Sequence, residues 1–216
     1  MIKHTLSGVY AAAITPLNQD QSIALEDIPP FLAFLAERGC HGALLLGTTG
    51  EGPSFAIHER LAIFEAAMKV KEVHPDFRLL AGTGTPSLEE TIILSKSAFD
   101  LGFQGVVVLP PYYFHQASED GLFTWFQEVI QRAVPQDGTL LGYHFPAQSG
   151  VPIPLGVISR LHQAFPQRFG GFKDSTPDAE YAFQIGKHLD EGLTALVGND
   201  KHLSPAMEAG ASGCIT

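Results

Sequence analysis

Lys173 is the residue of this sequence whose position most suggests covalent chemistry. It ends an apolar stretch, 170–173, that has the pattern of a buried strand, whereas Lys69 and Lys187 fall where a helix surface would keep an amine hydrated. A buried lysine is costly to keep charged, so burial favours the neutral amine. A neutral amine attacks a ketone and forms an imine, or Schiff base. The alternative is a structural ion pair between Lys173 and Asp174 or another carboxylate of the barrel, and position alone leaves both interpretations open.

Hydroxyl groups end other apolar runs. Tyr143 ends the run before that of Lys173, where a phenol is placed to pass a proton to or from a substrate oxygen. Its alternative role is to anchor a loop through its hydroxyl. The 47–52 loop offers backbone N–H groups and the hydroxyls of Thr48 and Thr49 ahead of a helix, which suits a carboxylate or a phosphate. The plainer interpretation of this loop is a turn and a helix cap, with Ser54 as the N-cap.

The histidines give no sign of a metal centre. All nine are scattered singly, and no two have the spacing of a metal pair on one helix or strand. His144 follows Tyr143 directly, so it should point to the opposite side of the same strand. We therefore expect no metal and no external cofactor, because an imine on Lys173 would itself supply the covalent step.

Composition excludes several classes of partner. The 216-residue chain is 45% hydrophobic with a formal net charge of −10, which is unfavourable for binding nucleic acid or an anionic membrane surface. Two cysteines, Cys40 and Cys214, are too few for a disulfide framework and indicate a reducing compartment, so a cytoplasmic location is expected. The N-terminus has no signal-peptide pattern, and the apolar run Val9–Ile14 is too short to cross a membrane.

Short apolar runs alternate with longer runs of helical period along the whole chain, which is typical of parallel βαβ units. The expected strands are Val9–Thr15, Gly42–Gly47, Arg78–Gly82, Gly105–Pro110, Thr139–Phe145, Gly170–Asp174, Ala195–Gly198 and Gly213–Thr216. The expected helices are Leu25–Arg38, Ile57–His74, Leu88–Leu101, Glu119–Val134, Pro154–Phe165, Asp178–Leu189 and Leu203–Ala209. Several of the strands are apolar on both faces, as strands covered on both sides are.

This alternation fits either a closed barrel or an open doubly wound sheet. The open sheet usually carries a Gly-rich fingerprint after its first strand, whereas here that strand runs into Thr15-Pro16. We therefore expect an α/β protein with a TIM (β/α)8 barrel, formed by residues 1–216 as a single domain. No eighth helix follows the last strand, which would expose the seam between strands eight and one. The chain is thus expected to be truncated at its C-terminus, or to have a partner over the seam.

Taken in order, these motifs resemble the N-acetylneuraminate lyase and dihydrodipicolinate synthase family of class I pyruvate-dependent aldolases. The resemblance extends from Gly8 to Thr216 and rests on five segments in the family's order: 47–51 (Gly-Thr-Thr-Gly-Glu), 111–113 (Pro-Tyr-Tyr), 143–146 (Tyr-His-Phe-Pro), 171–173 (Gly-Phe-Lys) and 198–200 (Gly-Asn-Asp). Family members continue past strand eight with a closing helix and a small helical extension, which are missing here. The resemblance also implies a homotetramer, a dimer of dimers.

The resemblance assigns a role to each candidate residue. Lys173 would form the imine with pyruvate or a 2-oxo acid, and Tyr143 would be the general acid and base. Thr48 and Thr49 would hold the pyruvate carboxylate, and Tyr113 would complete a proton relay in the site of a neighbouring subunit. The remaining substrate contacts implied are Ser175, Asp200 and Ile215.

Two departures from the family bear on the substrate. Dihydrodipicolinate synthases carry an arginine two residues after the proline of the tyrosine motif, where this chain has Gln148; the neuraminate lyases carry an acidic residue where it has Lys201. The segments 50–54 and 173–175 are similar to the 2-keto-3-deoxy-sugar-acid aldolases. The sequence therefore favours cleavage or formation of a 2-oxo-3-deoxy acid, with pyruvate and an aldehyde as partners.

Three alternatives stay open. The first is dihydrodipicolinate (4-hydroxy-tetrahydrodipicolinate) synthase, which would need another cation, such as Lys201, in place of the missing arginine. The second is a non-catalytic homologue that binds 2-oxo acids without turnover. The third is a metal-dependent enzyme on the same barrel.

Overall fold

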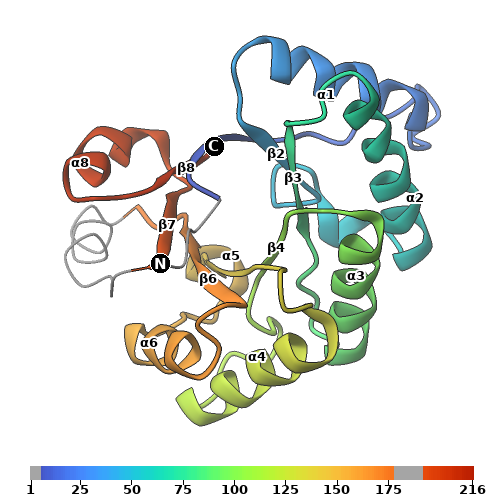
Figure 1. Cartoon of the computed structure of the whole chain (residues 1–216). Helices are drawn as coiled ribbons and strands as arrows, with labels where there is room; N and C mark the ends of the chain where they lie inside the picture. The colour runs from blue at the N-terminus through green and yellow to red at the C-terminus, as the bar shows by residue number, and fades with distance from the viewer. Residues whose placement is uncertain (1–5, 178–191) are drawn as a thin grey trace.

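The computed structural model describes residues 6–177 and 192–216. Its eight strands are all parallel and pair in chain order, β1 to β8, with β8 returning to β1 to close the barrel (Figure 1). The strands are β1 Gly8–Ala12, β2 Gly42–Leu45, β3 Arg78–Gly82, β4 Gly105–Val108, β5 Leu140–His144, β6 Phe169–Asp174, β7 Thr194–Val197 and β8 Gly213–Ile215. The predicted TIM-barrel fold is confirmed.

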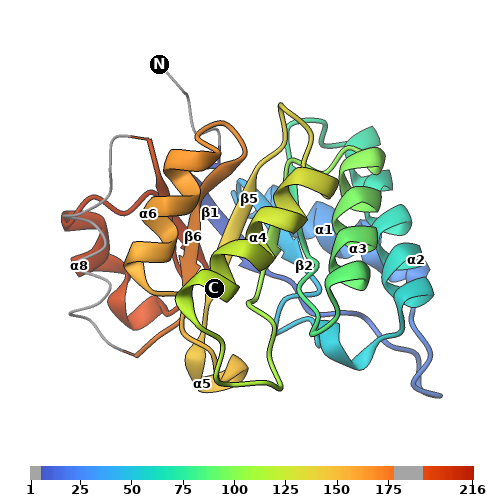
Figure 2. The same cartoon turned by 90° about the horizontal axis from the view of Figure 1, so that it is seen from below.

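Apart from the short α5, the α-helices lie around the outside of the barrel (Figure 1). They are α1 Ile28–Glu37, α2 Ile57–Met68, α3 Leu88–Leu101, α4 Glu119–Ala133, α5 Pro146–Ser149, α6 Leu155–Ala164 and α8 Leu203–Glu208, with short 3-10 turns η1 Leu25–Asp27, η2 Gly52–Ser54, η3 Lys69–Glu72 and η4 Asp200–His202. Seen from the side, α5 lies beyond the C-terminal end of β5, where the site loops are (Figure 2). Among the described residues, no helix has the length and apolar character needed to cross a membrane.

Most differences from the sequence prediction lie at the ends of elements. Strands β1, β2 and β4 end two or three residues earlier than expected, because the chain leaves the sheet to form the loops of the site. The expected helix Leu25–Arg38 divides into η1 and α1 ahead of Pro29 and Pro30, which lack the N–H groups that a continuous helix needs.

The N-cap of α2 is Ala56, whose N–H donates to the Glu59 carboxylate at 2.8 Å, so the prediction of Ser54 as the N-cap was wrong. The expected helix Asp178–Leu189 lies outside the described residues.

Two apolar layers hold the fold together, one inside the barrel and one between the strands and the helices. The inner layer contains Tyr10, Leu44, Leu80, Val107, Leu141, Tyr143, Leu196 and Ile215, together with Leu6. The larger outer layer packs α1 to α4 and α6 on the strands, with Phe64, Phe126, Phe169 and Phe172 at most 1% exposed. Because successive strand residues face opposite layers, the site residues can point inward while their neighbours pack against helices.

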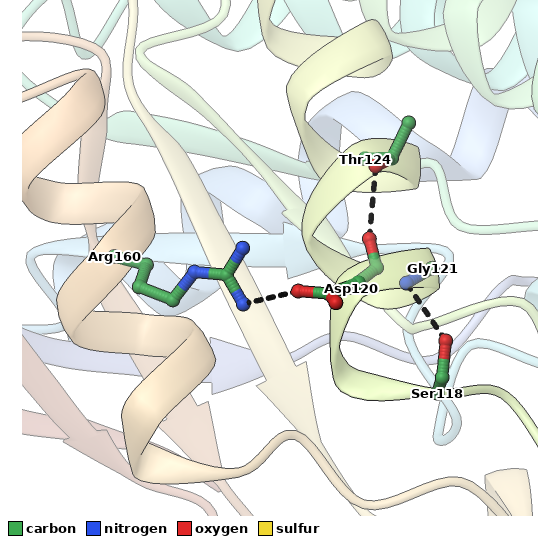
Figure 3. Close-up of polar contacts among 5 residues, drawn as sticks. All are labelled: Ser118, Asp120, Gly121, Thr124 and Arg160. Atoms are coloured by element: carbon green, nitrogen blue, oxygen red, sulfur yellow. Dashed lines mark hydrogen bonds and ion pairs between the residues drawn. The ribbon is translucent and has the colours of Figure 1, made fainter.

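Polar contacts on the outer ring tie neighbouring helices together. The Ser118 hydroxyl caps α4 by accepting from the N–H of Gly121 at 3.1 Å, and Asp120 in the same turn forms an ion pair with Arg160 of α6 at 2.8 Å (Figure 3). The Asp120 side chain is 87% exposed, so solvent screens this pair and it contributes about 0–1 kcal/mol. The ion pair therefore marks the α4–α6 contact without dominating the stability of the fold.

The seam between the last and first strands is closed by backbone pairing, with Gly8, Val9 and Tyr10 opposite Gly213, Cys214 and Ile215. On its outer face Val9 is 45% exposed.

Candidate active site

Lys173 lies on β6 and faces the interior of the barrel near its C-terminal end. The register places it beside Tyr143 of β5 and Leu196 of β7, both of the inner layer. Its side chain is 3% exposed, and burial lowers the pKa of its amine, an effect that the neighbouring Tyr143 opposes. Its Nζ lies 4.4 Å from the centre of the Tyr143 ring. A larger fraction of this amine is therefore neutral than in a surface lysine.

The alternative of a Lys173–Asp174 ion pair is excluded by the alternation along β6. The Asp174 carboxylate accepts hydrogen bonds from the backbone N–H and the hydroxyl of Thr176, at 3.1 and 2.9 Å. No carboxylate within residues 6–177 and 192–216 forms an ion pair with Lys173. A buried amine without a carboxylate partner in the described residues loses its proton more readily, and the neutral amine is the form that attacks a ketone.

Tyr143 brings three hydroxyls together next to the lysine. Its phenol oxygen lies 3.2 Å from Thr48 Oγ1, and Ser175 donates to it at 3.3 Å. Ser175 is on the same side of the chain as Lys173 because the two are separated by one residue. The sequence had suggested Ser175 only as a substrate contact, and this link to Tyr143 was missed. Three hydroxyls in contact can pass a proton to and from the space in front of Lys173.

A cavity of about 470 Å³ opens in front of these residues. Its lining includes seven of the eight predicted site residues: Thr48, Thr49, Tyr143, Lys173, Ser175, Asp200 and Ile215. Ala12, Phe145, Gly198, Asn199 and Thr216 complete it. This volume fits a ligand of metabolite size.

Gly198, at the end of β7, leaves room for the lysine. A Cβ at this position would overlap Ser175 Oγ and come within 2.8 Å of Lys173 Cε. The sequence prediction included Gly198 in a motif but gave it no role. Gly198 contributes to the site by having no side chain, which leaves space for the side chains of Lys173 and Ser175.

The loop that carries Thr48 and Thr49 turns tightly between β2 and α2. Leu46 and Glu51 have left-handed backbone angles, φ 55° and 53°, and the Thr15 hydroxyl donates to the carbonyl of Gly50 at 2.7 Å. Both threonines are exposed toward the cavity side, as a ligand-binding loop on a rigid barrel should be. Both line the same cavity as Lys173, and their role in holding a carboxylate stays a prediction.

Tyr113 does not join the site within one chain. Its side chain is 76% exposed and contacts only Phe114 among aromatic rings of the described residues, with the centres 5.1 Å apart. Its backbone is left-handed, with φ 93°, a strained conformation for a tyrosine. A strained backbone conformation of this kind persists only where the structure around the residue stabilises it.

A second cavity, of about 360 Å³, adjoins the first and shares Thr48 and Tyr143 with it. Arg60 and Gln148 line it, and so do Tyr112, Glu51 and Ser54. The sequence analysis did not predict Arg60 as a site residue. A signal was present, because Arg60, Ile63, Phe64 and Ala67 follow the spacing of the buried face of α2, and only Arg60 is charged.

The other polar predictions give a mixed result. His144 faces away from Tyr143, as predicted: its Nδ1 accepts from the N–H of Ile153 at 3.0 Å, and burial lowers the pKa of its imidazole to about 4. Asp200 lies in η4 at the rim of the first cavity, but the neighbouring Lys201 is exposed and lines neither cavity. Within the described residues, no group of three or more metal-ligating side chains is present.

Comparison with known proteins identifies the family. The model of the dihydrodipicolinate synthetase family matches residues 5–216. The chain belongs to this family. An uncharacterized DapA-like lyase from Chloroflexus aurantiacus is 37% identical over 97% of this chain, and a 4-hydroxy-tetrahydrodipicolinate synthase from Corynebacterium urealyticum is 32% identical over 96%. The chain spans 69% and 66% of these two relatives, about two thirds of their length.

Solved structures of the family have the same barrel. A dihydrodipicolinate synthase from Acinetobacter baumannii, complexed with pyruvate, superposes with a TM-score of 0.89 at 26% identity, covering 98% of this chain and 70% of that one. The family consists of pyruvate-dependent lyases and synthases, which confirms the aldolase and lyase class predicted from the motifs.

Proposed function

We propose that this chain is a class I aldolase that cleaves or forms a 2-oxo-3-deoxy acid, with pyruvate held as an imine on Lys173. The observation that carries the proposal is the buried amine of Lys173, without a carboxylate partner in the described residues, facing a cavity beside a group of three hydroxyls. Burial lowers the pKa of this amine, which raises the fraction of the nucleophilic form.

In the cleavage direction, Lys173 Nζ attacks the C2 ketone and water leaves, which gives a protonated imine. The Tyr143 oxygen accepts the proton of the C4 hydroxyl as the C3–C4 bond breaks. The bonding electron pair moves into an enamine, with the imine nitrogen as the electron sink, and the aldehyde departs. Protonation at C3 gives the pyruvate imine, and water hydrolyses it to pyruvate and the free amine.

The other predicted residues have supporting roles in this proposal. Thr48 and Thr49 hold the pyruvate carboxylate through hydroxyls and backbone N–H groups of their loop. Ser175 and Thr48 pass the proton of Tyr143, while Asp200 contacts substrate hydroxyls and Ile215 packs beside the pyruvate methyl group. Tyr113, exposed on its own chain, extends into the site of a second copy in a homotetramer, where its phenol joins the relay.

A second candidate, 4-hydroxy-tetrahydrodipicolinate synthase, shares the imine step. It is favoured by relatives such as the 4-hydroxy-tetrahydrodipicolinate synthase of Corynebacterium urealyticum. Against it, residue 148 is glutamine where the resemblance calls for an arginine, and Gln148 is exposed at the wall of the second cavity. We therefore place the aldolase first.

The test is to incubate the protein with pyruvate, add sodium borohydride, and determine the intact mass and the modified peptide. The expected result is one reduced pyruvate adduct on Lys173, absent in Lys173→Ala. A folded protein without an adduct would contradict the proposal and favour a non-catalytic homologue. Release of pyruvate from 2-keto-3-deoxy acids, against formation of 4-hydroxy-tetrahydrodipicolinate, then separates the two candidates.

A further inference from the structure

The second cavity contains a cation whose charge the surrounding protein does not balance. Arg60 is 5% exposed, and no carboxylate of the described residues lies within ion-pair distance of its guanidinium. Its Nε donates to the carbonyl of Phe55 at 3.0 Å, and its guanidinium also forms a hydrogen bond with the phenol of Tyr112. A guanidinium has five N–H donors, so these two contacts leave donors for a bound anion. A buried, permanently charged group without a counter-ion is costly.

The position of Arg60 on its helix increases this cost. It lies in the first turn of α2, where the aligned peptide dipoles already place partial positive charge. The one carboxylate in that turn, Glu59, accepts from the Ala56 N–H. Burial lowers the pKa of Arg60, and the phenol of Tyr112 and the carboxylate of Glu90 counteract this effect. A bound anion would relieve the imbalance.

The cavity also has the location that an aldehyde subsite requires. It shares Thr48 and Tyr143 with the cavity of Lys173, so a substrate attached to the lysine reaches it past the Tyr143 phenol. Gln148, at the position where the synthases carry an arginine, lines the same cavity. Lys201, the replacement cation suggested by the sequence, is exposed and does not line it.

We propose that Arg60 binds an oxyanion, a carboxylate or a phosphate, at the far end of the aldehyde partner, and so selects anionic aldehydes for the reaction at Lys173. This inference rests on the proposed aldolase function. A guanidinium recognises both oxyanions through paired N–H donors, and a volume of about 360 Å³ accommodates a phosphorylated triose. Glu51 also lines the cavity, but it is exposed, so solvent screens its repulsion.

The experiment compares charged and neutral aldehydes of the same carbon skeleton in condensation with pyruvate. The pairs are glyceraldehyde 3-phosphate against glyceraldehyde, and succinic semialdehyde against butanal, which separate phosphate from carboxylate. The wild-type protein is expected to have a kcat/KM at least about 10-fold higher for the charged member of one pair. Arg60→Gln should remove this preference, lowering kcat/KM for the charged aldehyde about 10- to 100-fold with little effect on the neutral one.

Three controls belong to the experiment. Arg160→Gln removes an arginine from the exterior (Figure 3) and should leave the preference intact. Arg60→Lys keeps the charge and should retain part of the preference, while Lys201→Gln tests the rival cation. Thermal unfolding shows whether each variant is folded, and borohydride trapping with pyruvate shows whether the imine still forms.

If turnover is too slow to measure kcat/KM, a binding measurement tests the same inference. Calorimetric titration of glyceraldehyde 3-phosphate or succinic semialdehyde onto the borohydride-reduced pyruvate adduct should show binding that Arg60→Gln weakens about 10-fold or more. The inference is overturned if no charged aldehyde is preferred or bound, if Arg60→Gln affects charged and neutral aldehydes equally, or if Lys201→Gln alone removes the preference. Failure to form any adduct is a different result, because it contradicts the proposed function itself.

Discussion

Two tyrosines of the inner layer each have a cation over the ring, toward opposite ends of the strands. Near the C-terminal end, Lys173 Nζ lies 4.4 Å from the centre of the Tyr143 ring; near the N-terminal end, the Arg78 guanidinium carbon lies 5.2 Å from that of Tyr10. Each pair also has a glycine beside it, Gly198 and Gly42 respectively. A tyrosine, a cation and a glycine thus lie together at two places in one barrel.

The surroundings differ. The Tyr143 hydroxyl contacts two other hydroxyls at the edge of a cavity, whereas the Tyr10 hydroxyl is fully buried and makes no hydrogen bond within the described residues. Burial raises the pKa of Tyr10 to about 12, an effect that Arg78 opposes. The cation differs as well, since lysine can lose its proton at accessible pH and arginine cannot. The end of the barrel at Tyr143 therefore differs from the end at Tyr10 in three respects that chemistry requires. It opens to a cavity, its tyrosine contacts other hydroxyls, and its cation can lose a proton and become a nucleophile.

The largest effect is expected from exchanging the cations. Lys173→Met should lower kcat/KM by at least about 10⁴-fold, because the covalent step is lost, and should abolish the borohydride adduct. Stability should be unchanged or higher by about 1 kcal/mol, since a buried amine without a carboxylate partner in the described residues is replaced by an apolar side chain of similar volume. Arg78→Met is the matched control at the other end and should keep the adduct. Loss of the adduct in both variants would show that the two ends do not differ as described.

Removal of the Tyr143 hydroxyl should have the next largest effect. Tyr143→Phe is expected to lower kcat about 10²- to 10⁴-fold, the usual contribution of general acid–base catalysis, while Lys173 still forms an adduct with pyruvate. Single-turnover measurements separate the two steps. If Tyr143→Phe prevents the adduct but leaves C–C cleavage unchanged, the tyrosine assists imine formation alone.

The two glycines should respond differently to a methyl group. Gly198→Ala would push on Lys173 and Ser175, and should lower kcat about 10-fold or more. Gly42→Ala would meet the Tyr10 ring, at 2.8 Å from two of its atoms, and should cost about 1–3 kcal/mol of stability with kcat little changed. Urea unfolding and steady-state kinetics on both variants test this. Equal losses of kcat would indicate a general distortion of the barrel.

The sequence was sufficient for the order and type of most elements. Apolar runs such as Gly42–Leu45 and Gly105–Val108 are buried on both faces, and their pattern predicted strands directly. The strand ends were less certain, because residues after Leu45 and Val108 are as apolar as those within the strands. Helix α5 was missed, since its four residues begin at a proline and have no helical period to detect.

The relative positions of the candidate residues could be predicted where the strand register decides the geometry. Tyr143 and Lys173 are paired across β5 and β6, so two residues at strand ends had to meet. Ser175 follows by alternation, but its contact with Tyr143 depends on side-chain rotamers that no pattern encodes. Arg60 comes from α2, the helix that follows the 47–51 loop, and only the folded barrel brings it into the same cavity as Gln148.

The smallest effect is expected from Tyr10→Phe. Removing a buried hydroxyl without a hydrogen-bond partner should leave kcat unchanged and the free energy of unfolding at pH 7 unchanged or raised by about 1 kcal/mol.

The difference in stability between Tyr10→Phe and the wild-type protein should appear at alkaline pH. The folded-state pKa of Tyr10, about 12, exceeds the value of 10.0 for the free side chain, so above pH 10 the unfolded chain ionises first and the wild-type protein loses up to about 3 kcal/mol as pH rises to 12. Tyr10→Phe lacks this loss, so its stability relative to wild type should increase over that range, as measured by urea unfolding at pH 8 to 11. A constant difference between the two proteins would mean that the Tyr10 hydroxyl ionises as easily folded as unfolded, and the contrast between the two ends of the barrel would be smaller than the structure indicates.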